Sequence, residues 1–477
     1  MLYIDRESKI PIYMQIYEHI KRDIISGNMP VESRIPSTRA LANELHVGRN
    51  SVENAYDQLK LEGYITSIPG SGYIVNRLEF DLIQELPKGK QPGDLMTKQP
   101  ASLPDKSKYS FQYGELDETN FPKKLWRMHL ADVLDEPLIH SPNNYADGKG
   151  DPQLRQQIKN YLYLNRGVQC ETEQIVLCSG TQSALEIIIR LLSVEKIIAM
   201  EEPCYDGARA VFLSNGFQIQ PVPVDEEGID LQKLSLQKAS IVYISPSHQF
   251  PTGTVMPIQN RMEILNLARR HDMMIIEDDY DSEFRYKGRA IPSLQSIDQF
   301  GRVIYVGTFS KALSPGLRIS YLVLPYWLLG TYQEKYRGYQ CTIPMIEQKT
   351  LLHFMQDGNW AKHIRRICLS QKRKHDTLMA AIHKIIGDRV RIFGHYAGLH
   401  ILLEFLDGQQ EEVLLQKALQ YGVLVCPVSP FWLDKGNYRG NTVVLGYGKI
   451  KEKDIEPAVE LLNEAWFNSD IVQNCIL

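Results

Sequence analysis

The chain has 477 residues, of which 43% are hydrophobic and 23% are charged, and its formal net charge is −4 at pH 7. This length exceeds one ordinary domain, and the composition is that of a globular protein with a large core. The small net charge excludes a polycation, so any contact with nucleic acid must come from locally placed Lys and Arg side chains.

Seven cysteines are scattered singly, with no CxxC pair and no His cluster at zinc spacing. The isolated placement of the cysteines predicts reduced thiols and no metal site. The start "MLYIDRESKI" has no apolar signal segment, and no window is apolar for long enough to span a membrane. We therefore expect a cytoplasmic protein.

The first predicted elements form a small module. In "PIYMQIYEHIKRDIISG" an isoleucine recurs every four residues, which predicts a helix with one apolar stripe. Ser37 is a suitable N-cap for a second helix, and "HVGR" predicts a tight turn before a third helix with Val52 and Leu59 on its inner face. The segment "YITSIPGSGYIV" predicts a β-hairpin with "PGSG" as its turn.

Two short helices joined by a Gly-containing turn, followed by a hairpin, are the elements of a winged helix-turn-helix. The segment "VGRNSV" resembles the corresponding run of GntR-type DNA-binding domains, with Gly48 in place of their usual serine cap. We expect Arg34, Arg39 and Arg49 at the starts of the second and third helices, where they can hold phosphates and read base edges. The predicted contacts to double-stranded DNA are Arg34, Ser37, Arg39, Arg49, Asn50, Ser51, Gly70 and Gly72. The alternative is a protein-binding winged helix, which the roughly balanced charge of the module would suit.

Residues 78–108 are rich in Pro, Lys, Gly and Asp and have no apolar period, which predicts a linker between domains at residues 1–77 and 109–470. Beyond the linker, short apolar runs alternate with amphipathic helices. The runs are "QIVLC", "KIIAM", "SIVYI", "MMIIE", "VIYV" and "ISYLVL". This alternation predicts an α/β domain whose mostly parallel sheet has helices on both faces.

The segment "VGTFSKALSPGLRIS" places one lysine, Lys311, just after a predicted buried strand. A lysine in such a place can form a Schiff base with an aldehyde cofactor. Pyridoxal phosphate (PLP) also needs a phosphate cup, an acid beside its pyridine nitrogen and a donor to its ring oxygen. Four carboxylates crowd the end of a predicted strand in "EDDYD", namely Glu277, Asp278, Asp279 and Asp281. Asp278 is our choice of acid, and Tyr280 can reach the ring oxygen.

The predicted phosphate cup has two parts. "CSGTQSALEIII" follows a strand and opens a helix, so the amides of Gly180, Thr181 and Gln182 face an anion site. The second part consists of Thr308, Ser310 and Arg318, whose guanidinium group is suited to phosphate.

The motifs "SGTQ", "DDY", "SK" and "PGLRISY" resemble those of fold-type I aminotransferases in order and spacing, over roughly residues 110–465. The resemblance implies the fold of a PLP-dependent transferase, with Lys311 as the Schiff-base lysine, Arg318 as the phosphate arginine and Asp278 as the pyridine partner. It also makes Tyr205, in "EEPCY", a residue beside the ring or the substrate.

Two positions depart from those enzymes. Phe250 stands where many of them have an asparagine that touches the ring oxygen. Val444 stands where we align the arginine that grips the substrate carboxylate. Both changes weaken the case for an efficient transaminase, so we expect the domain to sense an effector and not to turn over a substrate.

A GntR-like winged helix followed by an aminotransferase-like domain is the layout of the MocR family of bacterial regulators. "SPSHQFPTGT" and "GTFSKALSPGLRISY" are similar to that family's versions of the motifs. The resemblance implies a head-to-tail homodimer that binds operator DNA and is nucleoid-associated when bound. It also implies sensing of a small amine, an amino acid or PLP itself through aldimine exchange at Lys311.

GABA-responsive members of that family, as we align them, carry arginines at the places of Gly207 and Pro430. We therefore expect a weak response to GABA here, with Arg209 and Arg439 as the nearest arginines that could substitute. Two alternatives stay open. One is an active aminotransferase that carries a DNA-binding domain, and the other is a regulator whose large domain is only a dimerisation scaffold.

Overall fold

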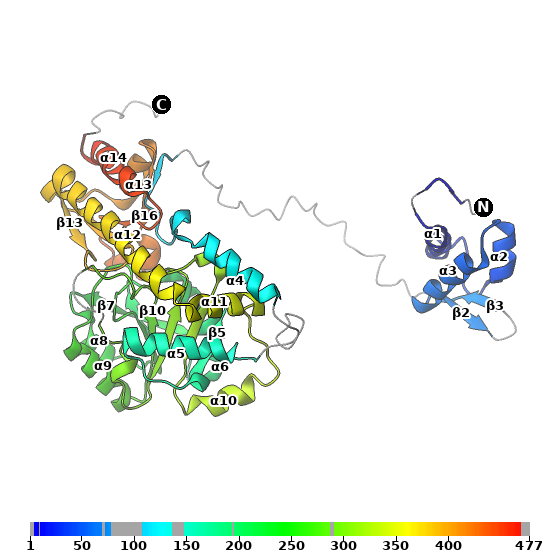
Figure 1. Cartoon of the computed structure of the whole chain (residues 1–477), viewed down its shortest axis with the longest axis horizontal. Coiled ribbons are helices and arrows are strands. Elements are labelled where there is room, and N and C mark those ends of the chain that lie inside the picture. Colours follow the sequence, from blue (N-terminus) through cyan, green and yellow to red (C-terminus); the bar gives the residue numbers. More distant parts are fainter. Residues whose placement is uncertain are drawn as a thin grey trace. The chain divides into compact units, whose positions relative to one another are not determined.

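The computed structural model describes residues 4–8, 10–68, 72–77, 107–135, 147–192, 195–286 and 291–468. The chain forms two units, Met1–Leu103 and Pro104–Leu477, and each is described by itself (Figure 1). The predicted linker at 78–108 lies outside the described residues except for its last two, so the domain boundaries stay a prediction. None of the described helices has the length and apolar run of a membrane span.

The N-terminal unit packs three helices against a small antiparallel sheet of order β1-β3-β2. Its elements are α1 (Ile12–Ile25), β1 (Arg34–Ile35), α2 (Thr38–Glu44), α3 (Arg49–Leu61), β2 (Ile65–Ile68) and β3 (Gly72–Val75). Ile16, Ile20 and Ile24 of the predicted stripe are buried against Val52 and Leu59 of α3 in one core. The helix-turn-helix and hairpin predicted for this segment are therefore present.

Local chemistry explains where the second and third helices begin. The Ser37 hydroxyl accepts a hydrogen bond from the Ala40 amide at 3.2 Å, so it is the predicted N-cap of α2. In the turn, His46 has a φ of 52°, a left-handed conformation that reverses the chain within a few residues. Gly48 is the N-cap of α3 and supplies no side-chain cap, so the first amides of α3 stay available to a ligand.

The larger unit is built on an eight-stranded sheet of order β5-β12-β11-β10-β9-β6-β7-β8. Neighbours from β11 to β7 are parallel, whereas β12 is antiparallel to both β11 and β5, and β8 is antiparallel to β7. The strands are β5 (Ile175–Cys178), β6 (Ile197–Glu202), β7 (Gln218–Asp225), β8 (Gly228–Ile229), β9 (Ile241–Ile244), β10 (Met274–Asp279), β11 (Val303–Thr308) and β12 (Ser320–Val323). Each of the six apolar runs that the sequence predicts as a strand forms a strand of this sheet.

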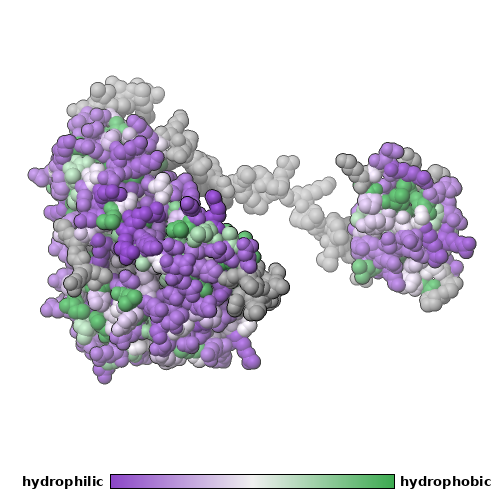
Figure 2. All heavy atoms as spheres, in the orientation of Figure 1, coloured by the Kyte–Doolittle hydropathy of each residue, from purple (hydrophilic) through white to green (hydrophobic). Residues whose placement is uncertain are grey.

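Helices cover both faces of this sheet, as the continuous apolar strands predict. Ile275 and Ile276 are neighbours on β10 and point to opposite faces, yet both are fully buried, in two different cores. The helices of this unit are α4 (Lys123–Asp135), α5 (Pro152–Arg166), α6 (Thr181–Leu191), α7 (Asp206–Ser214), α8 (Leu231–Ser235), α9 (Ile258–Arg270), α10 (Leu328–Lys335), α11 (Met345–Gln356), α12 (Asn359–Ala381), α13 (Glu411–Gln420) and α14 (Glu452–Asn463). Figure 2 shows hydrophilic residues over most of the visible face of the unit.

The C-terminal part of the larger unit has its own antiparallel sheet of order β13-β14-β17-β16, and the long helix α12 leads into it (Figure 1). Its strands are β13 (Val390–Phe393), β14 (His400–Phe405), β16 (Cys426–Pro427) and β17 (Thr442–Gly446). A short parallel pair, β4 (Tyr109–Ser110) with β15 (Val423–Leu424), joins the first described residues of the unit to this part. The small sheet thereby places Phe431 and His400 beside the loop that carries Phe250.

Candidate functional site

One cavity lies where the carboxyl ends of the central strands meet, the place at which open α/β sheets bind their ligands. Its lining residues are Tyr113, Thr181, Gln182, Tyr205, Ser245, Phe250, Asp278, Tyr280, Thr308, Ser310, Lys311, Pro315 and Arg318. Every predicted cofactor residue except Gly180 is in this set, and Gly180 lies directly against Arg318. The fold therefore brings together side chains that are far apart in the sequence.

Lys311 comes three residues after β11 and reaches into this cavity. Its Nζ atom lies 4.0 Å from the ring centroid of Tyr113, where the face of an aromatic ring attracts a cation. Burial lowers the pKa of the Lys311 ammonium group to about 8, although the carboxylates of Asp281 and Asp278 act in the opposite direction. A lowered pKa leaves more of the lysine as the neutral, nucleophilic amine near neutral pH.

The first part of the anion cup is the N-terminus of α6. Gly180, its N-cap, has a φ of 89° and no side chain to cap the first amides of the helix. A Cβ atom at Gly180 would lie 2.1 Å from the Nη2 atom of Arg318, so only glycine lets the guanidinium group sit over the helix end. Helix amides and a guanidinium group that face one cavity are the donors that a phosphate needs.

The second part of the cup is a chain of hydroxyl groups. Ser320 donates a hydrogen bond to the Thr308 hydroxyl at 2.8 Å, and Thr308 donates in turn to the Ser310 hydroxyl at 3.0 Å. The Ser310 amide also donates to Thr308 at 3.1 Å. Ser320 lies on β12 two residues after Arg318, and although it stands within the motif "PGLRISY", nothing in the sequence assigns it to the cup.

Asp278 is the buried acid that faces the cavity. One of its oxygens accepts a hydrogen bond from the Tyr243 hydroxyl, while the other, Oδ1, is buried without a hydrogen-bond partner in the described part of the protein. Burial raises the pKa of Asp278 to about 7, and the bond from Tyr243 partly offsets that rise. A buried acceptor without a donor is costly, and a protonated pyridine nitrogen would supply the missing donor.

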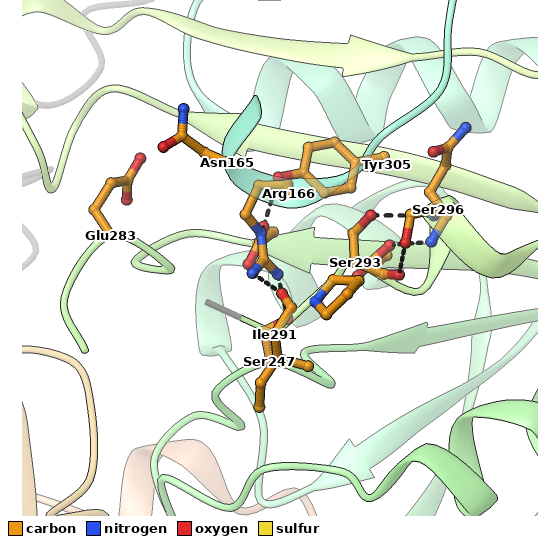
Figure 3. A network of polar contacts seen from close by, with 12 residues as sticks. Asn165, Arg166, Ser247, Glu283, Ile291, Ser293, Ser296 and Tyr305 are labelled. Carbon is orange, nitrogen blue, oxygen red and sulfur yellow. Dashed lines mark hydrogen bonds and ion pairs between the residues drawn. The ribbon is translucent and has the colours of Figure 1, made fainter. Parts of the chain in front are cut away.

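The neighbouring acids on β10 have other partners. Glu277 accepts hydrogen bonds from the Leu294 and Gln295 amides at 2.7 and 2.8 Å. Asp279 accepts from the Arg166 Nε atom at 2.7 Å and from the Tyr305 hydroxyl at 2.5 Å. Figure 3 shows Arg166 at the centre of this network, bonded also to Ser247. The alternation of side chains along the strand thus leaves Asp278 as the acid of β10 that lines the cavity.

The predicted DNA-contacting residues lie on the N-terminal unit. Arg39 and Arg49 are exposed in the first turns of α2 and α3, as predicted. Arg34 is also exposed, but its predicted place at the start of the second helix was wrong, because Arg34 pairs with Ile74 in the short strand β1. Gly70 lies outside the described residues.

Other contacts order this surface. The Tyr56 hydroxyl donates to the Pro36 carbonyl at 2.8 Å and so ties α3 to the segment before α2. The Arg49 Nε atom lies 2.8 Å from a Glu53 carboxylate oxygen one turn along the same helix. Asn50 is exposed and Ser51 is half-buried on α3, and Gly72 opens β3 with a φ of 93°.

Comparison with known proteins covers both units. The family of gntR bacterial regulatory proteins matches residues 12–75, and aminotransferase class I and II matches residues 121–443. YdeL of Bacillus subtilis, an uncharacterized HTH-type transcriptional regulator, is 38% identical over 97% of this chain and 98% of its own length. The probable rhizopine catabolism regulatory protein MocR of Rhizobium meliloti is 33% identical over 98% of this chain and 96% of its own length. The chain belongs to the MocR family of transcriptional regulators.

The larger unit of this MocR-family regulator also matches solved structures. The kynurenine aminotransferase of Pyrococcus horikoshii has a TM-score of 0.67 and 28% identity, over 75% of this chain and 90% of that one. The protein is therefore a PLP-dependent, DNA-binding transcriptional regulator with a GntR-type winged helix and a fold-type I aminotransferase domain. The predicted family, fold class and cofactor are confirmed.

Two further aromatic residues, Tyr113 and Phe250, line the regulator's cavity, and of these the sequence singles out only Phe250. Phe250 packs edge-on against Phe431, with ring centroids 4.7 Å apart. It also packs against Tyr113 at a centroid distance of 4.7 Å, with the two ring planes tilted by 33°. Tyr113 comes from the segment between β4 and α4, far in sequence from Lys311, so no local signal could link the two. At the place of the usual asparagine, the regulator thus has an apolar wall.

A histidine–aspartate pair supports Tyr280. The Nδ1 atom of His248 lies 2.9 Å from an Asp281 oxygen and 3.2 Å from the Tyr280 hydroxyl. His248 follows β9, and Tyr280 and Asp281 follow β10; Tyr280 lines the cavity, whereas His248 and Asp281 are buried. Asp281 is one of the acids of "EDDYD", but no local pattern relates it to His248, which lies 33 residues away in the chain.

The arginines considered as substitutes do not line the cavity. The Arg209 guanidinium group donates to the Pro430 carbonyl at 2.5 Å, and Arg439 lies 3.7 Å from Glu404 on the protein surface. Gly207 packs under the Tyr205 ring so closely that a Cβ atom would lie 2.4 Å from it. Among the described residues, Arg318 is thus the one guanidinium group of the cavity wall.

Proposed function

We propose that this regulator senses small primary amines at Lys311 and passes the change to its DNA-binding unit. The observation that supports this most directly is the shared cavity, in which an amine of lowered pKa, an unpaired buried carboxylate oxygen and an anion cup face one another. PLP, when bound, supplies an aldehyde that condenses reversibly with primary amines.

We assign each residue a role from its place in the cavity. Lys311 holds the cofactor and yields its place to an incoming amine. Arg318 and the amides of Thr181 and Gln182 hold the phosphate, while Asp278 accepts a hydrogen bond from the pyridine nitrogen. Tyr280, oriented by His248, donates toward the ring oxygen.

The proposed effector is a short amine or amino acid, including D-amino acids, with PLP itself as the other candidate signal. An effector with a distant carboxylate would bury a charge near the aromatic rings of Phe250 and Phe431. Arg318, the one arginine among the described lining residues, belongs to the anion cup, and Arg209 does not line the cavity. An unpaired buried charge costs several kcal/mol. GABA is therefore expected to bind weakly.

The response must reach the DNA through two states of the protein that differ in affinity for the effector. We propose that the regulator is a head-to-tail homodimer whose winged helices bind paired half-sites of an operator in the nucleoid. The DNA contacts then come from Arg34, Arg39 and Arg49, supported by Ser37, Asn50 and Ser51, and by the wing glycines Gly70 and Gly72.

Lys311→Ala provides the test. The variant is expected to lose the visible absorption band and the borohydride-trappable adduct of the cofactor, while the fold and basal DNA binding remain. In the wild-type protein, a panel of amines should shift the band with saturation, and the same amines should change operator affinity. Steady conversion of an amino donor and a keto acid would instead support an aminotransferase, and a missing band would support a scaffold. A trappable adduct in Lys311→Ala would refute the role of Lys311.

A further inference from the structure

A second group of ligating side chains lies outside the cofactor cavity, where α4 packs against α11 (Figure 1). His129 and Asp132 are on α4, and His353 is in the last turn of α11. One ligand atom from each of these three residues lies within 4.8 Å of the others. In the described part of the chain, this is the one cluster of three or more His, Cys, Asp or Glu side chains with such spacing.

Asp357, the residue that caps the C-terminus of α11, extends this cluster. The Nδ1 atom of His129 lies 3.7 Å from an Asp132 oxygen and 3.8 Å from an Asp357 oxygen. A tetrahedral zinc ion with bonds of about 2.0–2.2 Å holds its ligand atoms roughly 3.3–3.6 Å apart. Small changes of side-chain torsion would therefore bring the ligand atoms of His129, Asp132 and His353 to coordination distance. The Asp357 oxygen, which lies near His129, can supply the fourth ligand.

The two helices supply their ligands in matching pairs. His129 and Asp132 are three residues apart on α4, and His353 and Asp357 are four residues apart at the end of α11. Both spacings place a pair of side chains on one face of a helix. The C-terminus of α11 also carries the negative end of the helix dipole, which favours a cation there.

His129 is held in place for such a role. Its side chain is 1% exposed, its ring packs edge-on against Phe354, and its Nε2 atom lies 3.1 Å from the side-chain amide nitrogen of Asn359. If the Asn359 amide turns over, its oxygen accepts the Nε2 proton and the Nδ1 lone pair is left facing the two carboxylates. A hydrogen bond from the outer nitrogen is the usual support of a histidine ligand.

We propose that His129, Asp132, His353 and Asp357 bind one divalent transition-metal ion, with Zn²⁺ as the best match. Two imidazole nitrogens and two carboxylate oxygens suit Zn²⁺ and Co²⁺, whereas Mg²⁺ and Ca²⁺ prefer oxygen ligands alone. The Asp132 and Asp357 side chains are 57% and 60% exposed, so an ion can reach them from solvent. The sequence predicts no metal site, because the two pairs of ligands lie on helices that are far apart in the chain.

The bound ion would join α4 to α11. An ion that binds only the folded protein would raise the thermal stability of the larger unit as the metal concentration rises. This effect is independent of the amine sensing at Lys311, because none of the four ligands lines the cofactor cavity.

The test is a titration of full-length, tag-free, PLP-loaded protein with Zn²⁺ in competition with a chromophoric chelator. One ion per chain is expected, and Co²⁺ should give the absorption of a tetrahedral site. His353→Gln and Asp357→Asn should each weaken Zn²⁺ binding by at least about tenfold. Asn359→Ala, which keeps all four ligands, should weaken it by roughly 10–100-fold. His271→Gln changes an exposed histidine at the end of α9 and should leave binding unchanged.

All four variants keep the cofactor cavity intact, so an unchanged cofactor absorption band reports that each protein is folded. Zn²⁺ affinity that is the same in His353→Gln, Asp357→Asn and His271→Gln would overturn the proposal. So would the absence of an ion at one equivalent per chain in the wild-type protein. Because cofactor loading is measured separately, neither result bears on the amine-sensing function.

Discussion

At the scale of single residues, the lowered pKa of Lys311 sets a pH dependence. The cofactor-free protein should form its covalent adduct with PLP faster as pH rises toward about 8, and the rate should then level off, because the amine is by then neutral. Stopped-flow measurement of the visible band tests this. A rate that keeps rising toward pH 10 would contradict the lowered pKa.

The same shift affects stability. The folded-state pKa of Lys311 lies below its ordinary value of 10.5, so between pH 8 and 10.5 the unfolded chain holds the proton that the folded chain has lost. This group therefore makes the cofactor-free protein more stable as pH rises through that window. Denaturant unfolding of wild-type protein and Lys311→Met at several pH values isolates the contribution.

A second residue-scale prediction concerns Tyr243, which donates a hydrogen bond to Asp278. Tyr243→Phe removes a bond that favours the carboxylate, so the pKa of Asp278 should rise further. Hydrogen bonds to charged groups contribute about 1.5–3 kcal/mol, so affinity for PLP should fall at least roughly tenfold. Fluorescence titration measures this. Tyr305→Phe, which removes the bond to Asp279 on the other side of β10, is the matched control and should keep its affinity.

At the scale of elements, the start of α6 depends on Gly180. Gly180→Ala would place a methyl group against the Arg318 guanidinium group. It would also force the alanine backbone to adopt the positive φ of this position. We expect the affinity for PLP to fall by about tenfold or more, which corresponds to about 1.4 kcal/mol. Gly316→Ala is the control in the neighbouring loop, where the new atom would lie 3.6 Å from Ser314. Equal cofactor affinity in the two variants would refute this role of α6.

Arg49, at the start of α3, supports a prediction about the affinity of the regulator for operator DNA. Arg49→Ala should cost about 1–3 kcal/mol of operator binding if Arg49 reads a base. If Arg49 contacts only a phosphate, all sequences should bind more weakly and the salt slope should fall by about one. Lys60→Ala, at the other end of α3, is the control. Unchanged affinity in Arg34→Ala, Arg39→Ala and Arg49→Ala would exclude this surface as the DNA contact.

At the scale of the whole molecule, the proposed homodimer predicts a sedimenting species of twice the 54.7 kDa of one chain. Fold-type I sites are usually completed by a partner subunit, and dimeric helix-turn-helix proteins bind paired half-sites. Sedimentation velocity at micromolar concentration tests the prediction, with and without PLP. A stable monomer that binds the cofactor fully would contradict it.

Features that depend on neighbouring residues in the chain could be predicted from the sequence alone. Ser37 caps α2 because its hydroxyl reaches an amide three residues away, and the apolar runs form strands because both faces of the sheet are covered. The cofactor motifs could be recognised because each combines a strand end with small, hydroxyl or charged residues. Lys311, Asp278 and Arg318 accordingly line one cavity.

Other features follow only from contacts between distant segments. Arg34 lies in a strand because β3 pairs with it, and a two-residue strand has no sequence pattern of its own. The contacts of Tyr113 with Lys311 and of Asn359 with His129 join residues far apart in the chain. The sequence determined which elements form and which motifs they carry, because local hydrogen bonds and apolar periodicity decide these. The tertiary structure decided which side chains meet, because packing of the sheet and helices sets those distances.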